Sequence, residues 1–221
     1  MDQDPRARSG ACCPDKAAGV PVRRARRPAE ETREEILNTA EKLFRTHGYA
    51  SVTIADIAAE LSMSPANVFK HFRTKTSLVD AIATRAIEQT LHALKSLASD
   101  KPAPERLYAL AHHLMQEHLS EQKDAPFVFE MILVTITEEL DCGDRYREIV
   151  VGMIAEIIHA GIREGVYHAG DVPRLANTSF DALACVIHPV MTGMEKAGIM
   201  ATRCREVVGL IDAALRSPLA K

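Results

Sequence analysis

The sequence lacks tryptophan altogether, and all aromatic residues together make up only 5% of the chain. Glycine is also scarce, with 11 residues in 221. No segment sustains the alternation of apolar and polar residues that marks a half-buried strand. Ala, Leu, Ile, Glu and Arg, in contrast, are abundant, and most of these residue types favour helix. The composition therefore argues against a sheet protein and predicts an all-α fold.

The chain also lacks paired cysteines and an apolar leader. Its five cysteines form no Cys-x-x-Cys pair; they are Cys12, Cys13, Cys142, Cys185 and Cys204. Residues 1–10 contain no apolar core of the kind found in a signal peptide. Free thiols are typical of a reducing compartment, so we expect a cytoplasmic protein.

Residues 175–194 require a check for a membrane segment, because Asp181 is their single formal charge. A spanning helix needs about 20 predominantly apolar residues. Several polar side chains and Pro189 interrupt this run. The stretch therefore predicts a helix buried in protein, and we expect no membrane partner.

Charge is divided unevenly along the chain. Residues 1–78 carry 13 Lys and Arg against 10 Asp and Glu, whereas residues 79–221 carry 14 against 20. A basic front and an acidic back indicate that the front meets an anion. Residues 1–28 contain almost no large apolar groups, so they are predicted to form a disordered basic arm. Four arginines at 23–27 end this arm, and they are either a solubilising tail or a DNA contact.

Helical periodicity divides the remaining chain into two domains. We expect a small three-helix domain over 29–76 and a larger helical domain over 77–221, with about nine helices in total. The predicted helices span about 30–47, 54–61, 65–72, 75–97, 104–121, 126–140, 144–164, 171–197 and 201–216.

The second and third predicted helices form a helix-turn-helix. Thr53, with Asp56 three residues on, is a capping box for the second helix. Ser64 is placed to cap the third helix, and Pro65 opens it at the position where proline costs least. The third helix would be the one that enters the major groove of DNA.

Residues 32–82 closely resemble the DNA-binding domain of TetR-family transcriptional regulators. The resemblance implies a homodimer with a palindromic double-stranded DNA operator and a small-molecule effector as partners. It also implies a ligand-responsive regulator, most often a repressor, although an activator of the same family stays open. The residues that carry it are Leu43, Phe44, Gly48, Tyr49, Thr53, Ile57, Ala58, Ser64, His71, Phe72, Lys75 and Leu78.

The resemblance further implies that Thr53, position 69, His71 and Lys75 lie along DNA phosphates, and that the exposed face of 64–70 reads bases. Two residues depart from the family pattern. The usual glycine of the turn is Ser62, which predicts backbone strain there. The common tyrosine at position 69 is Phe69, which has no hydroxyl for a phosphate.

The chemistry of these residues agrees with DNA contact. The basic side chains after the third helix suit phosphate neutralisation, although a charge run by itself is usually a solvated face. Asn67 could pair with adenine and Ala66 could contact a thymine methyl, or both could be ordinary helix surface residues. The candidate DNA-binding set is Thr53, Ser64, Ala66, Asn67, Phe69, Lys70, His71 and Lys75.

The predicted helix of 171–197 is apolar on two sides. One stripe contains Val172, Leu175, Leu183, Val186, Val190 and Met194, and the other contains Phe180, Ala184, Ile187 and Met191. A helix buried on two sides needs a partner besides its own core, so we expect a homodimer through residues 171–216. The alternative is a central helix of a monomeric bundle.

A polar spot interrupts the same helix. Cys185 and His188 lie three residues apart, and Pro189 removes a helical hydrogen bond and predicts a kink. We expect an effector pocket lined by the helices of 104–121, 126–140 and 144–164 and closed by this kink. The candidate ligand-binding residues are His113, Leu114, His118, Met131, Cys185 and His188. A core histidine, or a metal site completed by His118 or His159, is the alternative for His188.

Recognisable catalytic motifs are missing from the sequence. It contains no nucleophile elbow, no phosphate-binding glycine loop and no carboxylates in a catalytic spacing. We therefore expect no enzymatic activity, no cofactor and no resident metal. A helical interaction protein without DNA binding, or a metal-dependent hydrolase using His and Glu of 105–195, would be the alternatives.

Overall fold

A computed structural model of the chain describes residues 28–96, 100–124, 127–193 and 197–217. All regular structure in these ranges is helical, which confirms the predicted all-α class. The arginine-rich arm at 23–27 lies outside the described residues. The helices are α1 (Ala29–His47), α2 (Ile54–Glu60), α3 (Pro65–His71), α4 (Lys75–Ser96), α5 (Ala103–Asp124), α6 (Val128–Thr137), α7 (Asp141–Arg163), α8 (Val172–Ile187), α9 (Pro189–Gly193) and α10 (Ala197–Leu215).

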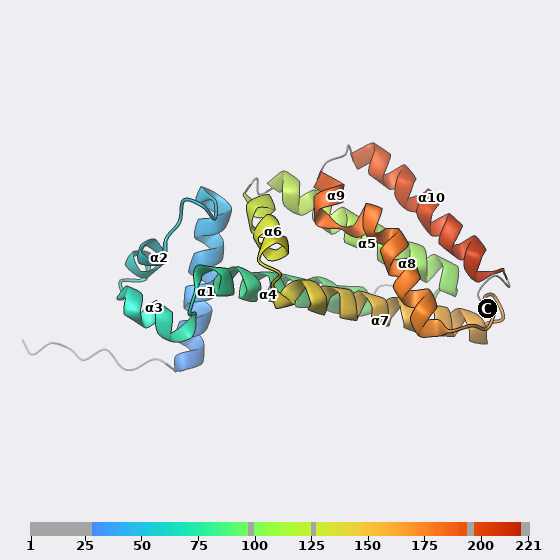
Figure 1. Cartoon of the computed structure of the whole chain (residues 1–221), viewed down its shortest axis with the longest axis horizontal. Coiled ribbons are helices and arrows are strands. Elements are labelled where there is room, and N and C mark those ends of the chain that lie inside the picture. The colour runs from blue at the N-terminus through green and yellow to red at the C-terminus, as the bar shows by residue number, and fades with distance from the viewer. Residues whose placement is uncertain (1–27, 97–99, 125–126, 194–196, 218–221) are drawn as a thin grey trace, which may run out of the picture.

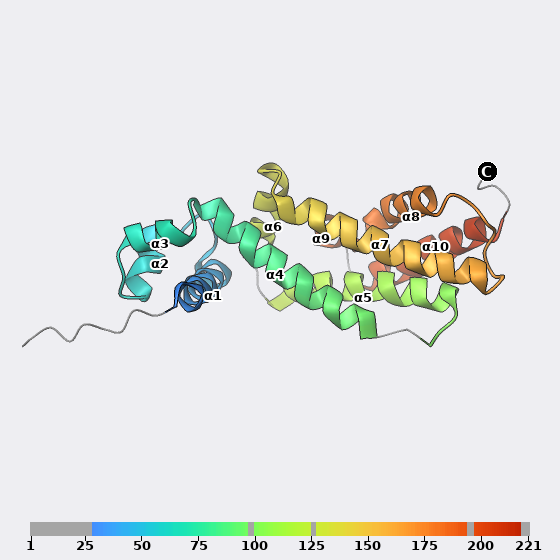
Figure 2. The ribbon, with the colours of Figure 1, turned by 90° about the horizontal axis from the view of Figure 1, so that it is seen from below.

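The molecule is elongated, with α1, α2 and α3 at one end and α8 and α10 toward the other (Figures 1 and 2). Helix α4 runs from the first group into the second, where it packs against α5 and α7. No helix within the described ranges has both the length and the apolar character needed to cross a membrane.

Local signals explain the helix-turn-helix. Thr53 and Asp56 form the predicted capping box, in which the Thr53 side chain accepts from the Asp56 N–H and the Asp56 carboxylate accepts from the Thr53 N–H. Gly48 ends α1 at a φ of 84°, a conformation that glycine adopts without strain. Ser62, in the turn between α2 and α3, has a φ of 52°. The strain predicted at this serine is therefore present, because a side chain disfavours the left-handed region.

The core of the helix-turn-helix extends beyond α1–α3. Ile36, Phe44, Ile57, Val68 and Phe72 form its centre. The same cluster includes Leu78, Val79 and Ile82 of α4 and Val128 and Met131 of α6. The predicted boundary at residues 76–77 thus falls where α4 begins, and α4 and α6 belong to the packing of both halves of the molecule.

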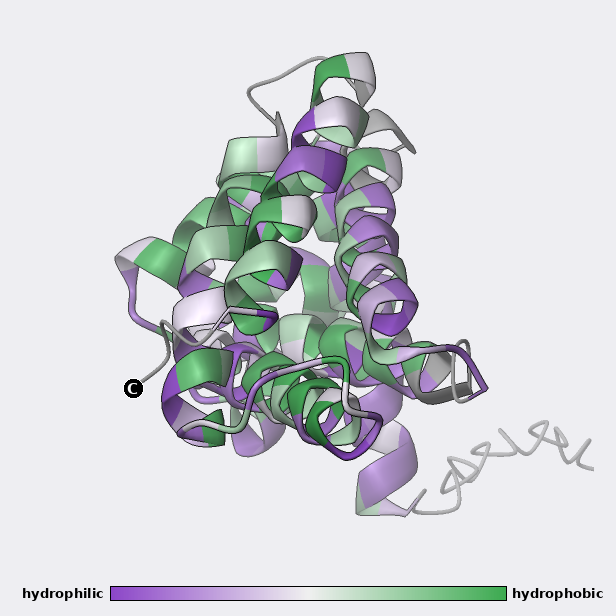
Figure 3. Cartoon of the chain, turned by 90° about the vertical axis from the view of Figure 1, so that its right-hand side faces the viewer, coloured by the Kyte–Doolittle hydropathy of each residue, from purple (hydrophilic) through white to green (hydrophobic). Residues whose placement is uncertain are grey.

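The larger half is a bundle in which α7 packs on α8, and α10 packs on α5 and α8. Viewed along the long axis, its helices carry both hydrophobic and hydrophilic residues, as amphipathic helices do (Figure 3). Leu107, Ile154, Leu183 and Met200 are buried in its core. Leu183, which lies on one of the two apolar stripes predicted for residues 171–197, therefore packs within its own chain. Gly161 of α7 lies so close to the ring of Tyr167 that a Cβ atom would overlap that ring.

The long helix predicted over 171–197 is divided in two. Helix α8 ends at Ile187, His188 leaves the helical conformation at ψ 124°, and Pro189 opens the short α9. The residue before a proline is pushed out of the α region, so the predicted kink becomes a break. This break adds α9 to the expected helices and leaves the fold class unchanged.

Candidate DNA-binding surface and ligand cavity

Helix α3 presents an exposed face at the end of the molecule that is farthest from α10 (Figure 1). Ser64, Ala66, Phe69 and Lys70 are exposed on it, and Phe69 keeps 48% of its surface in contact with solvent. Thr53, at the start of α2, is exposed too. An exposed phenylalanine beside lysine is unusual on a surface with no partner, and it suits apolar contact with a base edge.

Two other candidates of α3 are less accessible. Asn67 is half-buried, and its side-chain amide lies 3.6 Å from the Met63 sulfur. His71 is also half-buried at the end of the helix. Ser64 occupies the predicted N-cap position, but its hydroxyl makes no capping hydrogen bond. The Ser64 hydroxyl is therefore available to a phosphate, whereas Asn67 must turn away from Met63 to reach a base.

Lys75 is tied to the protein. Its ammonium donates to the Tyr49 carbonyl and lies 4.0 Å from the centroid of the Tyr49 ring. Burial lowers the pKa of Lys75, against the opposing effect of Glu130 and Asp56. An ammonium has three donors, so the bond to Tyr49 leaves donors for a phosphate. The same bond fixes the loop after α1 against the start of α4. Sequence reasoning missed this anchoring contact, because it depends on where a loop passes.

A cavity of about 360 Å³ lies between α4, α6, α7 and the break between α8 and α9. Its walls are mainly apolar, and they include Val79, Ile82, Met131, Ile132 and Ile187. A mostly apolar hollow with a few polar groups is typical of a small-molecule site. The cavity thus has the character expected of an effector pocket.

His118 of α5 supplies a polar group to this cavity. Its imidazole is hydrogen-bonded to the Ile187 backbone, while its buried Nε2 has no hydrogen-bond partner in the described ranges. The bonded nitrogen is therefore Nδ1, which donates to the Ile187 carbonyl. Burial, together with the neighbouring His188, lowers the pKa of His118 from 6.5 to about 4. The ring is neutral at pH 7, and its Nε2 is a hydrogen-bond acceptor.

Tyr146 of α7 supplies a second polar group. Its ring centroid lies 6.2 Å from that of His118, and its buried hydroxyl also has no partner among the described residues. Burial raises the pKa of Tyr146, so the phenol keeps its proton. Phe180 packs against the Tyr146 ring in an edge-on arrangement with centroids 6.4 Å apart.

His188 supplies a third polar group at the helix break. Its Nδ1 accepts a hydrogen bond of 3.3 Å from the Val190 N–H. Burial lowers the pKa of His188. The neutral ring therefore carries its proton on Nε2, and the imidazole caps α9 while it lines the cavity.

The structure gathers three of the six predicted ligand-binding residues on this cavity: His118, Met131 and His188. Leu114 is buried in the core of the larger half. His113 lies outside the cavity, 3.8 Å from Glu117. Cys185 packs against the core next to α10. Burial raises the pKa of Cys204 on α10 to about 11, and the neighbouring Cys185 thiol adds to this rise.

Most of the other lining residues escaped the sequence reasoning, among them Tyr146, Arg147 and Phe180. No local motif marks them, although Tyr146 and Arg147 lie on a helix predicted to line the pocket. Arg147 stacks on the Phe180 ring at 4.7 Å and pairs with Asp181 at 2.8 Å. Its charge is therefore already balanced.

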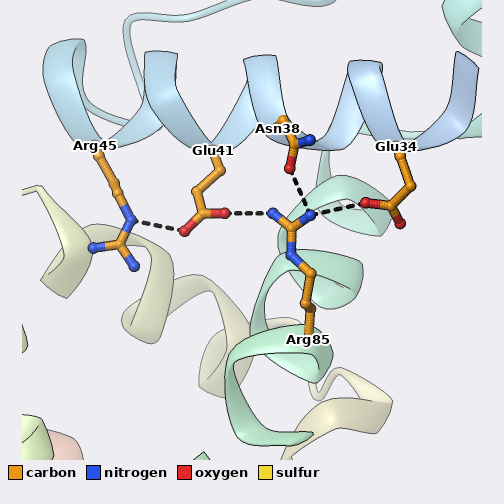
Figure 4. Close-up of polar contacts among 5 residues, drawn as sticks. All are labelled: Glu34, Asn38, Glu41, Arg45 and Arg85. Carbon is orange, nitrogen blue, oxygen red and sulfur yellow. Dashed lines mark hydrogen bonds and ion pairs between the residues drawn. The ribbon is translucent and has the colours of Figure 1, made fainter. Parts of the chain in front are cut away.

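A polar cluster joins α1 to α4 next to the cavity (Figure 4). The Arg85 guanidinium of α4 lies between Glu34, Asn38 and Glu41 of α1, at 3.1 Å from Glu34 and 2.7 Å from Asn38. Glu41 also accepts from Arg45 at 2.9 Å, and Arg45 lines the cavity. The cluster connects the cavity wall to the first helix of the DNA-binding half.

The described part of the chain holds no group of three or more His, Cys, Asp or Glu side chains placed to bind a metal ion. His159, considered as a partner for His188 in a metal site, is exposed on α7 and lies outside the cavity.

Two family models match the chain. Residues 36–82 match the model of bacterial regulatory proteins of the tetR family. Residues 103–208 match the model of the tetracyclin repressor-like C-terminal domain. Together they cover both halves of the molecule.

Individual relatives agree with these models. The HTH-type transcriptional regulator TtgR of Pseudomonas putida is 34% identical over 79 residues, which are 36% of this chain and 38% of that protein. A TetR transcription regulator from Haloarcula marismortui shares the fold with a TM-score of 0.62 and 23% identity over 84% of this chain and 98% of that one. Thermus thermophilus FadR, a TetR-family repressor solved with lauroyl-CoA, has a TM-score of 0.60 and 18% identity over 81% of this chain and 92% of that one.

Proposed function

The chain belongs to the TetR family of transcriptional regulators, a family of DNA-binding proteins and not of enzymes, and we propose that it is a homodimeric repressor that an effector releases from a palindromic operator. The observation that carries this proposal is the sharing of residues between the two sites. Val79, Ile82, Val128 and Met131 line the cavity and also belong to the hydrophobic cluster of the helix-turn-helix.

The shared residues give a physical route from effector to DNA. A ligand that displaces α4 or α6 must also shift the cluster on which α3 rests. The Arg85 cluster couples the same movement to α1, because its carboxylates belong to α1 and its guanidinium belongs to α4. Two recognition helices whose separation no longer matches successive major grooves lose affinity for a palindrome. The effect is limited by the difference in ligand affinity between the two states.

We assign roles on the DNA as follows. Lys70 neutralises a phosphate, and Ser64, Thr53 and His71 lie along the backbone. Ala66, Asn67 and Phe69 face base edges. Lys75 holds a phosphate with the donors that its contact with Tyr49 leaves over.

We propose that two chains associate through α8 and α10. The exposed faces of these helices carry small residues, with Ala182 on α8 and Thr202, Gly209 and Ala213 on α10. Beside them Leu210 is 72% exposed. Small residues let two helix pairs approach closely, and an exposed leucine next to them gains from burial in a four-helix interface.

The proposal is tested on an operator selected from random palindromic DNA. Binding is measured by fluorescence anisotropy at several salt concentrations for wild type, Lys70→Ala and Asn67→Ala. Lys70→Ala should weaken binding about equally on all sequences and reduce the salt slope by about one unit. Asn67→Ala should relax preference at one operator position, by roughly 1–3 kcal/mol if the contact is bidentate.

Lys101→Ala is the matched control, because Lys101 is exposed in the loop before α5, within the larger half. Lys101→Ala should change neither the salt slope nor the base preference of operator binding. Equal, sequence-independent losses from Lys70→Ala and Asn67→Ala would contradict the assigned roles, and binding without salt dependence would contradict DNA recognition itself.

A further inference from the structure

Two buried polar atoms on the cavity wall have no hydrogen-bond partner within the part of the chain that the structure describes: Nε2 of His118 and the hydroxyl oxygen of Tyr146. Both residues line the cavity, and their ring centroids are 6.2 Å apart. Nearly all buried polar groups in folded proteins have partners, because a desolvated group without one costs free energy. Two such atoms from different helices on one wall indicate that a ligand supplies the partners.

The two atoms differ in hydrogen-bonding character. The Nδ1 of His118 is committed to the Ile187 carbonyl, and the neutral ring therefore offers Nε2 as an acceptor only. The Tyr146 phenol keeps its proton and can donate. One ligand group that donates to the first and accepts from the second would satisfy both, and a hydroxyl does this.

The charges around the cavity argue against an anionic ligand. Arg147 pairs with Asp181 at 2.8 Å, and Arg45 pairs with Glu41 at 2.9 Å. Both arginines of the lining thus already have carboxylate partners, and a carboxylate on the ligand would face the lone pair of His118. The Thr135 hydroxyl donates to a carbonyl of its own helix.

We propose that the cavity binds a neutral, largely apolar molecule with a phenolic or alcoholic hydroxyl, which donates to Nε2 of His118 and accepts from Tyr146. This inference rests on the proposed function, in which the cavity holds the effector. The remaining lining, which includes Ile132, Ile136 and Phe180, receives the apolar body of the ligand.

The test uses three probes with one apolar body: 4-pentylphenol, its methyl ether and 4-pentylbenzoate. Calorimetry at pH 7.5 measures their affinity for the full chain. The phenol should bind about ten-fold more tightly than the ether, which cannot donate to His118, because leaving a buried acceptor unpaired costs a hydrogen bond. The benzoate should bind more weakly than the phenol by at least the same factor.

Two variants assign the difference to the named atoms. His118→Phe keeps a ring but removes the acceptor, and Tyr146→Phe keeps the ring but removes the donor. Each should lower phenol affinity about ten-fold. His118→Phe should leave ether affinity unchanged, because the ether has no proton to donate, whereas Tyr146→Phe should also lower ether affinity, because the ether oxygen accepts from Tyr146. His113→Phe, on the same helix but outside the cavity, should leave both unchanged. Thermal melting of each variant identifies one that fails to fold, and the other then carries the test.

Equal binding of phenol and ether, tighter binding of the benzoate, or no binding by any probe would overturn the inference. Its outcome is separable from that of the proposed function. Selective phenol binding that leaves operator affinity unchanged would support the hydroxyl site and contradict the proposed release from DNA. Operator release by a ligand without a hydroxyl would support the proposed release from DNA and contradict the hydroxyl site.

Discussion

The neutral, buried imidazole of His118 makes folding stability depend on pH. Its pKa falls from 6.5 to about 4 in the folded chain, first because of burial and then because of His188. The unfolded chain takes up a proton near pH 6.5, whereas the folded chain resists it. The contribution of His118 is therefore fully present above pH 6.5 and is lost as the pH falls toward 4.

The size of this effect follows from the two pKa values. Each unit of difference corresponds to about 1.4 kcal/mol, so the full loss for His118 is about 3 kcal/mol per chain. By pH 5.5 roughly 1 kcal/mol of it should already be gone. His188 acts in the same direction, because burial lowers its pKa as well.

Urea denaturation at fixed protein concentration, at pH 7.5 and pH 5.5, measures this loss. His118→Gln removes the titrating group and can still donate to the Ile187 carbonyl, so its stability should change less with pH than that of wild type, by roughly 1 kcal/mol. His113→Gln, on the same helix but outside the cavity, should behave like wild type. If wild type and His118→Gln lose the same stability between the two pH values, the neutral buried state of His118 is wrong.

Three substitutions test the packing and the interface. Gly161→Ala should lower the free energy of unfolding by roughly 1–3 kcal/mol, because its methyl group meets a buried tyrosine ring. Gly152 lies in the same helix with open space around it, so Gly152→Ala should stabilise the protein by up to about 1 kcal/mol. Similar effects at both glycines would refute the close packing of Gly161 against Tyr167. Leu210→Glu should weaken the dimer roughly hundred-fold, as measured by sedimentation, because it buries an unpaired charge in the interface. Leu133→Glu, at an exposed position on α6, should leave the dimer intact. An undisturbed Leu210→Glu dimer would place the interface elsewhere. Ser62→Gly should raise the melting temperature and the free energy of unfolding by up to about 1 kcal/mol by relieving the left-handed turn, and a loss of stability would contradict strain there.

The helices and their ends could be predicted because their signals are local. The capping box at Thr53, the glycine that ends α1, and Pro189 each act within a few residues of their position in the chain. Helical periodicity supplied the apolar faces. What periodicity does not encode is the surface against which a face packs. Periodicity predicted two apolar stripes on the helix of 171–197 without assigning either to the core, and Leu183 of the first stripe is buried in the core of its own chain.

The cavity was only partly predictable for the same reason. His188 stood out as a polar residue in an apolar stretch, His118 was a candidate on a helix predicted to line the pocket, and both line the cavity. Tyr146 was missed because its meeting with His118 depends on how α5 and α7 cross. The bond from Lys75 to the Tyr49 carbonyl likewise depends on the path of a loop. Contacts between distant segments require the folded arrangement.

The coupling of the cavity to the DNA-binding surface is tested most directly by the affinity of one ligand for the protein with and without DNA. Calorimetry gives the dissociation constant of 4-pentylphenol for the free protein and for the protein saturated with its selected operator. By linkage, a ligand that weakens operator binding must itself bind more weakly to the operator complex by the same factor. We predict a reduction of about ten-fold or more, within the usual range of coupling between sites. Equal ligand affinity in the two states would contradict the account.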